Sequence, residues 1–292
     1  VPIRWLQRKD GRYVMEKYKQ VEKAHQFRAL HDGRRVLLLP NAWDAGSARL
    51  FAQMGFAAIA TTSGGVAWSL GYSDGEQAAL EDVLAATSRM VRVSALPVSV
   101  DFEAGYANTP EALAANVAAL IETGVAGINL EDGIRHESLR DIDDAAARIA
   151  AARGAAQAAG VPIFINARVD TWMIGGDADA AARMDDALRR ARAYIAAGAD
   201  GIYPIGLADP ALIARFCVAI DAPVNIAARA GLPNLAELGR LGVARVSTAT
   251  RLAMLALSAA RAGAKTLLDD GRFDGLDADF RYEDAQRLFA SS

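Results

Sequence analysis

The stretch Gly124-Val-Ala-Gly-Ile-Asn-Leu-Glu-Asp132 leaves an Ala-rich segment through a glycine and becomes a short apolar run ending in two acids. A glycine placed this way ends a helix, and an unbroken apolar run is typical of a parallel strand buried on both faces. Other runs begin with proline, which is tolerated as a strand's first residue. The two kinds of entry alternate along the chain, with glycines at 55, 124, 198 and 242 and prolines at 97, 162 and 223.

These entries predict eight strands separated by helical segments, including Ser47–Met54, Glu76–Ser94, Thr109–Thr123, Asp143–Ala159 and Asp179–Ala197. The strands are expected at 36–39, 57–61, 98–101, 126–131, 162–167, 200–204, 223–227 and 243–247. Eight such units in about 250 residues predict a (β/α)8 TIM barrel of class α/β. A doubly wound open sheet is the alternative, but none of the runs is polar on one face, as an edge strand would be.

Composition excludes several classes of protein. The 292 residues are 52% hydrophobic, with a net charge of −3 and interspersed acidic and basic residues. This pattern predicts no nucleic-acid partner and no membrane association. The single cysteine, Cys217, excludes an internal disulfide framework and fits a reducing cytoplasm.

The chain is expected to hold one domain. Residues 1–14 precede Met15, a plausible chain start, and we expect them to be an added or disordered extension. Residues 15–292 are then predicted to form a single barrel domain with a C-terminal helical tail.

Acidic side chains follow neighbouring predicted strands. Asp101 and Glu103 come after the third strand and Glu131 ends the fourth. The active site of a barrel lies at this end of the strands. Three carboxylates there would repel one another unless a cation neutralised them, and oxygen ligands favour Mg2+ or Mn2+. The alternative is that these acids cap helices or pair with arginines.

Two further features suggest a site for carboxylates. Arg168 directly follows an apolar strand, where its planar fork could hold a carboxylate, unless it pairs with Asp170 or Glu131. The turn Thr62-Ser63-Gly64-Gly65 offers hydroxyls and unobstructed backbone N–H groups. Asn225, at the end of the seventh strand, could bond a substrate oxygen or only satisfy backbone groups.

Missing residue types narrow the chemistry. Residues 24–264 contain no lysine, so a Schiff base is not expected. A Ser-His-Asp triad has no obvious histidine other than His136. Metal-stabilised enolate chemistry remains, because a chelating 2-oxo acid lets the ion absorb the charge of bond cleavage.

With these residues in view, the chain resembles the isocitrate lyase and phosphoenolpyruvate mutase superfamily. The resemblance rests on five motifs, at 39–49, 61–74, 100–106, 127–132 and 166–170. It implies a metal surrounded by Asp101, Glu103 and Glu131, with Asp74 in the same shell. It implies that Arg168 and the Thr62–Gly64 turn, which includes Ser63, hold substrate carboxylates. It also implies a homotetramer, a dimer of dimers, with the last barrel helix, at about 250–268, swapped between subunits.

The chain departs from that family at two places. The Lys-Lys-Cys-Gly-His loop of the isocitrate and methylisocitrate lyases is absent, and residues 132–141 carry His136 and Glu137 instead. Glu103 stands where many members have an aspartate. The predicted activity is a Mg2+-dependent lyase or decarboxylase that cleaves a C–C bond in a small 2-oxo or 2-hydroxy acid, with water, Tyr106 or His136 delivering the proton. The alternatives are C–P chemistry, disfavoured because an Asn-containing gating segment is missing, and a non-catalytic barrel that binds metal and 2-oxo acid.

Overall fold

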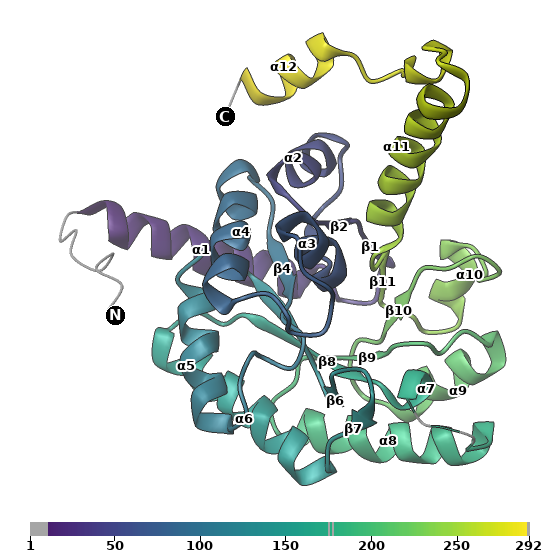
Figure 1. Cartoon of the computed structure of the whole chain (residues 1–292). Helices are drawn as coiled ribbons and strands as arrows, with labels where there is room; N and C mark the ends of the chain where they lie inside the picture. The colour runs from purple at the N-terminus through teal and green to yellow at the C-terminus, as the bar shows by residue number, and fades with distance from the viewer. Residues whose placement is uncertain (1–10, 175, 177, 291–292) are drawn as a thin grey trace.

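The computed structural model describes residues 11–174, 176 and 178–290, and its parallel strands form the predicted barrel (Figure 1). One run of paired strands follows the order β2-β3-β4-β5-β8-β9, and a second follows β1-β11-β10. A bridge between Ile202 and Val224 joins β9 to β10, and β1 leads into β2 across Pro40, so the two runs close on each other. The strands are β1 (Leu37–Leu39), β2 (Asn41–Ala42), β3 (Ile59–Thr61), β4 (Val98–Asp101), β5 (Gly127–Glu131), β8 (Phe164–Val169), β9 (Gly201–Pro204), β10 (Asn225–Ala227) and β11 (Arg245–Ser247).

The glycine entries have the predicted conformation. Gly55, Gly124, Gly198 and Gly242 all have positive φ, between 90° and 106°, a region that side-chain-bearing residues avoid. The first predicted strand, 36–39, corresponds to β1, and β2 continues it beyond Pro40, which has no N–H to donate to a neighbouring strand.

Helices cover the outside of the barrel. Several begin at side-chain caps, as where Asp44 accepts a hydrogen bond from the Ser47 N–H at the start of α2. The helix expected from Glu76 begins only at Leu80, because Glu76 itself has a φ of 59°. The helices are α2 (Ala45–Gln53), α3 (Ser63–Leu70), α4 (Leu80–Val93), α5 (Pro110–Ile121), α6 (Ile142–Ala159), α7 (Thr171–Ile174), α8 (Ala180–Ala196), α9 (Pro210–Ala219) and α10 (Leu235–Arg240).

Helix α1 (Gly11–Ala29) closes the amino end of the barrel. Phe27 lies edge-on to Phe164, and His31, just past the helix, stacks on the same ring with centroids 4.1 Å apart. These aromatic rings fill the barrel interior below the carboxyl ends of the strands. The helix crosses the boundary expected after residue 14, and residues 1–10 lie outside the described part of the chain.

The C-terminal segment leaves the barrel. Helix α11 (Arg251–Asp270) projects away, η1 (Asp274–Leu276) turns the chain, and α12 (Tyr282–Ala290) returns to α2, where Arg49 donates to the carbonyl of Leu288 (Figure 1). Within α11 only Ala253 is buried. None of the helices in the described residues combines the length and apolarity needed to cross a membrane.

Candidate active site

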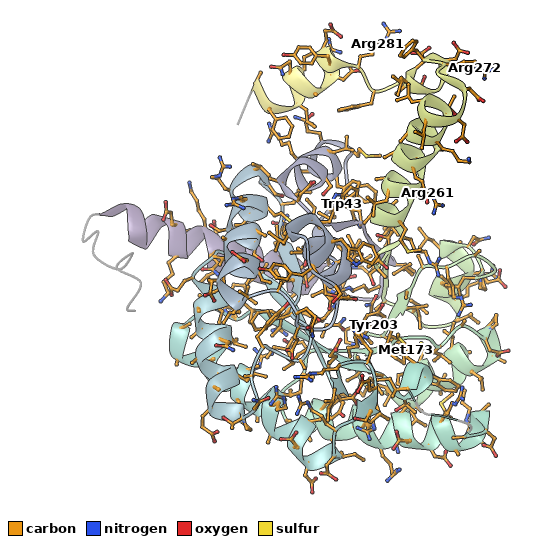
Figure 2. The ribbon with its side chains drawn as sticks, in the orientation of Figure 1. Trp43, Met173, Tyr203, Arg261, Arg272 and Arg281 are labelled. Atoms are coloured by element: carbon orange, nitrogen blue, oxygen red, sulfur yellow. The ribbon has the colours of Figure 1, made fainter. Side chains whose placement is uncertain are left out.

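A cavity of about 370 Å3 lies at the carboxyl ends of the barrel strands. Figure 2 shows Met173 and Tyr203, two of its wall residues, near the centre of the barrel. The wall contains six residues predicted from sequence: Thr62, Ser63, Asp74, Asp101, His136 and Arg168. These six residues converge on one cavity from segments far apart in the sequence, whereas Glu103, Glu131, Tyr106 and Asn225 are not among its lining residues.

The acidic residues of this site are only partly neutralised by protein groups. Asp74 Oδ1 and Asp101 Oδ1 are buried without a hydrogen-bond partner. Burial raises the pKa of Glu131, against the lowering effect of Arg168. Burial, reinforced by the charges of Asp74 and Asp101, raises the pKa of Glu103 to about 7. A divalent cation would offset all of these effects, and the oxygen-rich donor set suits a hard ion.

Asp74 and Glu103 are close enough to share an ion with His136, whereas Asp101 belongs to neither of the two clusters among the described residues. Atoms from Asp74, Glu103 and His136 lie within 4.8 Å of one another, and so do atoms from Glu131, His136 and Asp170. The second group is the poorer metal site, because the guanidinium of Arg168 already contacts Glu131 and Asp170.

Glu103, Tyr106 and Glu76 are joined by a small network of hydrogen bonds. The Tyr106 hydroxyl donates to Glu103 Oε1, and the Glu76 N–H donates to Glu103 Oε2 at 2.6 Å. The Tyr106 N–H donates to Glu76 Oε1 at 2.5 Å. All three residues have positive φ, and this network of hydrogen bonds stabilises that conformation. The Tyr106 hydroxyl is thus directed at Glu103, and we assign it to fixing that carboxylate.

Arg168 is buried in the wall and already has two carboxylate partners. Its Nε and Nη2 donate in parallel to Asp170 at 2.7 and 2.8 Å, and its Nη1 lies 2.5 Å from Glu131 Oε2. The fork expected to hold a substrate carboxylate is therefore occupied by Asp170. Since Nη2 also donates to Met173 Sδ at 3.9 Å, one of the five guanidinium N–H groups, on Nη1, remains for a ligand.

His136 stands on a hairpin that the sequence did not predict. Strands β6 (Gly133–Ile134) and β7 (Ser138–Leu139) pair antiparallel, and Arg135 and His136 at the turn both have positive φ. His136 Nε2 lies 3.9 Å from Asp74 Oδ2, and Nδ1 lies 3.9 Å from Glu131 Oε1. Neither ring nitrogen has a hydrogen-bond partner. The imidazole is thus placed between two carboxylates of the metal cluster.

The segment expected to be a glycine-rich turn is helical. Thr62 is the N-cap of α3, and Ser63 and Gly64 form its first turn. The Ser63 N–H points to Asp101 Oδ2 at 3.3 Å, so the helix start faces the acidic cluster. A side chain at Gly64 would come within 3.0 Å of Asp74 Oδ2. Gly64 therefore permits the close approach of Asp74, while Thr62 and Ser63 reach the cavity.

Asn225 lies inside the barrel below the cavity wall. It is buried, and its Nδ2 donates to Ser247 Oγ at 3.2 Å while its Oδ1 has no partner. Ser247 lines the cavity, so Asn225 reaches the site through Ser247.

This chain is similar to proteins of a known family. The family model described as phosphoenolpyruvate phosphomutase matches residues 27–268. The chain belongs to the phosphoenolpyruvate phosphomutase family. This family lies in a superfamily of enzymes that includes carbon–carbon lyases, and the barrel agrees with its solved structures.

Three relatives of this phosphomutase-family chain have informative names. A proposed phosphonomutase from Burkholderia cenocepacia J2315 is 46% identical, with a TM-score of 0.79 over 84% of this chain and 99% of that one. The 2-methylisocitrate lyase of Escherichia coli (strain K12) is 30% identical over 73% of this chain and 70% of its own length. The oxaloacetate decarboxylase of Ectopseudomonas mendocina (strain ymp) is 30% identical over 79% of both chains.

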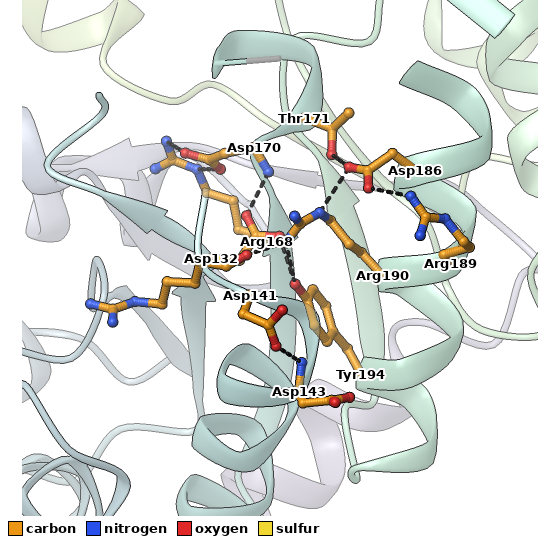
Figure 3. A network of polar contacts seen from close by, with 11 residues as sticks. Asp132, Asp141, Asp143, Arg168, Asp170, Thr171, Asp186, Arg189, Arg190 and Tyr194 are labelled. Carbon is orange, nitrogen blue, oxygen red and sulfur yellow. Dashed lines mark hydrogen bonds and ion pairs between the residues drawn. The ribbon is translucent and has the colours of Figure 1, made fainter. Parts of the chain in front are cut away.

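A buried polar network supports the phosphomutase-family site from behind (Figure 3). Asp132 accepts hydrogen bonds from Tyr194 Oη at 2.6 Å, from Arg190 Nη1 at 3.1 Å and from the Asp170 N–H at 2.9 Å. Arg190 in turn donates to Asp186, which also accepts from Thr171. This network links α8 to the residues that follow β5 and β8.

Sequence reasoning did not identify every residue of the wall. Asn129 lines the cavity and lies on the same side of β5 as Glu131, because side chains two residues apart on a strand point the same way. Its spacing from the predicted Glu131 could have revealed it. Met173 belongs to the short helix α7, which no sequence signal indicated.

Proposed function

We propose that this protein is a Mg2+-dependent lyase or decarboxylase that cleaves a C–C bond in a small 2-oxo or 2-hydroxy carboxylic acid. The observation that carries the proposal is one cavity in which unpartnered oxygens of Asp74 and Asp101 stand with the buried guanidinium of Arg168. A cation and an anionic ligand are the two groups that such a wall would accept together. The names of the E. coli and Ectopseudomonas relatives support this reaction class.

The metal would be held by carboxylates from two strand ends, β4 and β5, and one loop: Asp74, Asp101, Glu103 and Glu131. We assign Mg2+, with Mn2+ as a substitute, because oxygen ligands dominate the set. When bound, the ion supplies a Lewis acid that draws off the negative charge developing as the C–C bond breaks.

The chain's own residues would bind and orient the acid. Arg168, with its remaining Nη1 N–H, and the hydroxyl-bearing Thr62 and Ser63 line the cavity and suit carboxylate oxygens. We propose His136 as the residue that delivers the proton to the product, because both its ring nitrogens are free of hydrogen bonds and it lines the cavity.

Carbon–phosphorus chemistry is the second candidate function. The Burkholderia structure, 46% identical, is named as a proposed phosphonomutase. A phosphonate, like a carboxylate, has anionic oxygens that accept hydrogen bonds, so the cavity wall at Arg168 would accept either group.

A panel of 2-oxo and 2-hydroxy acids, including phosphonopyruvate, tests these candidates with and without Mg2+. We expect pyruvate or another 2-oxo acid to be released only with metal, and Asp101→Asn to weaken Mn2+ binding at least 10-fold in calorimetry. Asp209→Asn is the matched control, because Asp209 only caps α9. Phosphate release from phosphonopyruvate would favour the second candidate. Oxalate binding without any turnover would indicate a non-catalytic barrel.

We further propose a homotetramer, a dimer of dimers, in which α11 is swapped onto a partner subunit. Helix α11 projects from the barrel (Figure 1). The support for the swap is that four of its apolar side chains are exposed: Met254, Leu255, Leu257 and Leu268. A patch of this kind on an unpaired helix is typical of a protein interface.

Light scattering of the full chain tests the assembly. We expect a mass near four times the 30.8 kDa of one chain, and a lower mass after Leu255→Glu with Leu257→Glu. A monomeric full chain would contradict the proposal.

The expected partner in the cell is a small carboxylic acid, with neither nucleic acid nor membrane involved. We propose the cytoplasm as its location, because one cysteine among 292 residues fits a reducing compartment.

A further inference from the structure

A buried arginine lies inside the barrel beneath the cavity. Arg245 and Ser247 are two residues apart on β11, so both side chains point into the barrel. Ser247 lines the cavity, and Arg245 therefore lies one layer deeper. On its other side, the guanidinium carbon lies 5.8 Å from the centre of the Phe27 ring at the closed end of the barrel. Arg245 thus separates the aromatic closure from the cavity floor.

The charge of Arg245 is not neutralised by the protein. The side chain is 1% exposed, and its Nε and Nη1 have no hydrogen-bond partner. No ion pair joins it to a carboxylate within the described ranges. Burial lowers the pKa of its guanidinium to about 10, which leaves it protonated at neutral pH. An uncompensated buried charge is costly, so a residue of this kind is expected to serve a ligand.

Asn129 connects Arg245 to the cavity. Its Oδ1 accepts from Arg245 Nη2 at 3.3 Å and from Asn166 Nδ2 at 2.9 Å. With the amide oxygen engaged by two donors, Asn129 has its Nδ2 left to donate, and the residue itself lines the cavity. The floor therefore offers an N–H donor backed by a positive charge.

We propose that Arg245 is a positioning residue that makes the cavity floor electropositive, acts through Asn129, and selects acids with a second anionic group. This rests on the proposed function, which places one carboxylate of the acid near Arg168 and the metal. The floor then takes a second carboxylate, so dicarboxylates are bound in preference to monocarboxylates. Arg168 and Arg245 lie in different layers of the barrel, so each would attract a different end of the acid.

Arg245→Gln distinguishes this role from a structural one, because a fixed positive charge attracts the acid and repels the metal. One unit charge at about 10 Å and an effective dielectric constant of about 20 changes binding roughly 10-fold. In the variant we expect malonate, a dianion, to bind about 10-fold more weakly in the presence of Mn2+. The affinity for propionate, a monoanion with the same three-carbon chain, should change much less. Mn2+ alone should bind more tightly.

Two further variants separate charge from packing. Phe27→Leu removes the ring beside Arg245 and leaves the charge, so it should lower the melting temperature without altering either affinity. Asn129→Leu leaves the charge and removes the donor, so it should weaken malonate binding with little change for Mn2+. It keeps the inference testable if Arg245→Gln does not fold.

The outcomes are distinct. If Arg245→Gln shifts Mn2+ and malonate in the same direction or shifts neither, or if Asn129→Leu binds malonate as tightly as the native protein, the inference is wrong while the proposed function stands. If the native protein binds neither Mn2+ nor malonate, the proposed function itself fails.

Discussion

Asp170 holds Arg168 through two parallel hydrogen bonds of 2.7 and 2.8 Å, and the two residues are only two positions apart on the same strand end. The carboxylate fixes the plane of the guanidinium and leaves its Nη1 side to face Glu131. The orientation of the anion-binding group is therefore set before any ligand arrives.

Replacing Asp170 with asparagine should disturb this orientation without changing side-chain size. An amide can accept only one of the two hydrogen bonds and carries no charge. We expect kcat/KM on the acid that turns over to fall about 10- to 100-fold, as for other residues that orient a binding group. Asp144→Asn, which alters a half-buried pair between Asp144 on α6 and Arg140 before it, should leave activity unchanged. Native activity in Asp170→Asn would contradict this role.

Two glycines should respond in opposite ways to alanine. A Cβ at Gly65 would lie 2.7 Å from the Thr62 and Trp43 side chains, so Gly65→Ala should lower the free energy of unfolding by about 1–3 kcal/mol. Gly154 lies exposed within α6 with no atom within 4 Å of its Cβ position, so Gly154→Ala should raise it by about 0.5–1 kcal/mol. Urea denaturation measures both. Equal effects would show that the packing at α3 is looser than described.

The stability of the protein should decrease below pH 6.5 because of His31. Burial, together with the positive charge of Arg245, lowers the pKa of His31 from 6.5 to about 3. The neutral imidazole is favoured in the folded state, so its contribution is complete above pH 6.5 and is lost as the pH falls towards 3. At pH 5 the loss is about 2 kcal/mol.

His31→Phe provides the comparison for this effect. The difference in unfolding free energy between the native chain and the variant should shift by about 2 kcal/mol between pH 7 and pH 5. His25→Gln, an exposed change on the preceding helix α1, should show no such shift. A difference that does not vary with pH would exclude His31 as the titrating group.

The network behind the site should contribute to stability. Tyr194→Phe removes the hydroxyl that donates to buried Asp132 at 2.6 Å, and we expect a loss of about 1–3 kcal/mol in chemical denaturation. Tyr72→Phe, at an exposed position, should cost nothing measurable. If both variants are equally stable, Arg190 and the Asp170 N–H suffice to satisfy Asp132.

Sequence periodicity predicted the barrel because local backbone chemistry determines the strand entries. The positive φ that Gly124 and Gly198 adopt is a local requirement, visible without any tertiary contact. The convergence of Asp101 and Arg168 also followed, since parallel strands bring their carboxyl ends together.

Features that depend on distant contacts were not predictable in this way. Because Gly64 and Gly65 are weak helix formers, the sequence predicted a turn at the start of α3, although tertiary packing makes it helical. The direction of Tyr106 depends on a positive φ that tyrosine rarely adopts, so its contact with Glu103 had no local signal. The closure of the barrel by Phe27 depends on where α1 docks. That position is a property of the whole core.

The two ends of the β6–β7 hairpin are joined, because the Arg140 N–H donates a hydrogen bond to the Asp132 carbonyl at 2.9 Å. Asp132 is fixed from behind by Tyr194 and Arg190, and Arg190 also donates to the Arg140 carbonyl, so the base of the hairpin is attached to a rigid part of the barrel. Its length and sequence can change without displacing the strand that carries Glu131. The hairpin is thus an exchangeable unit through which evolution can vary the proton-carrying group while the rest of the site is inherited intact.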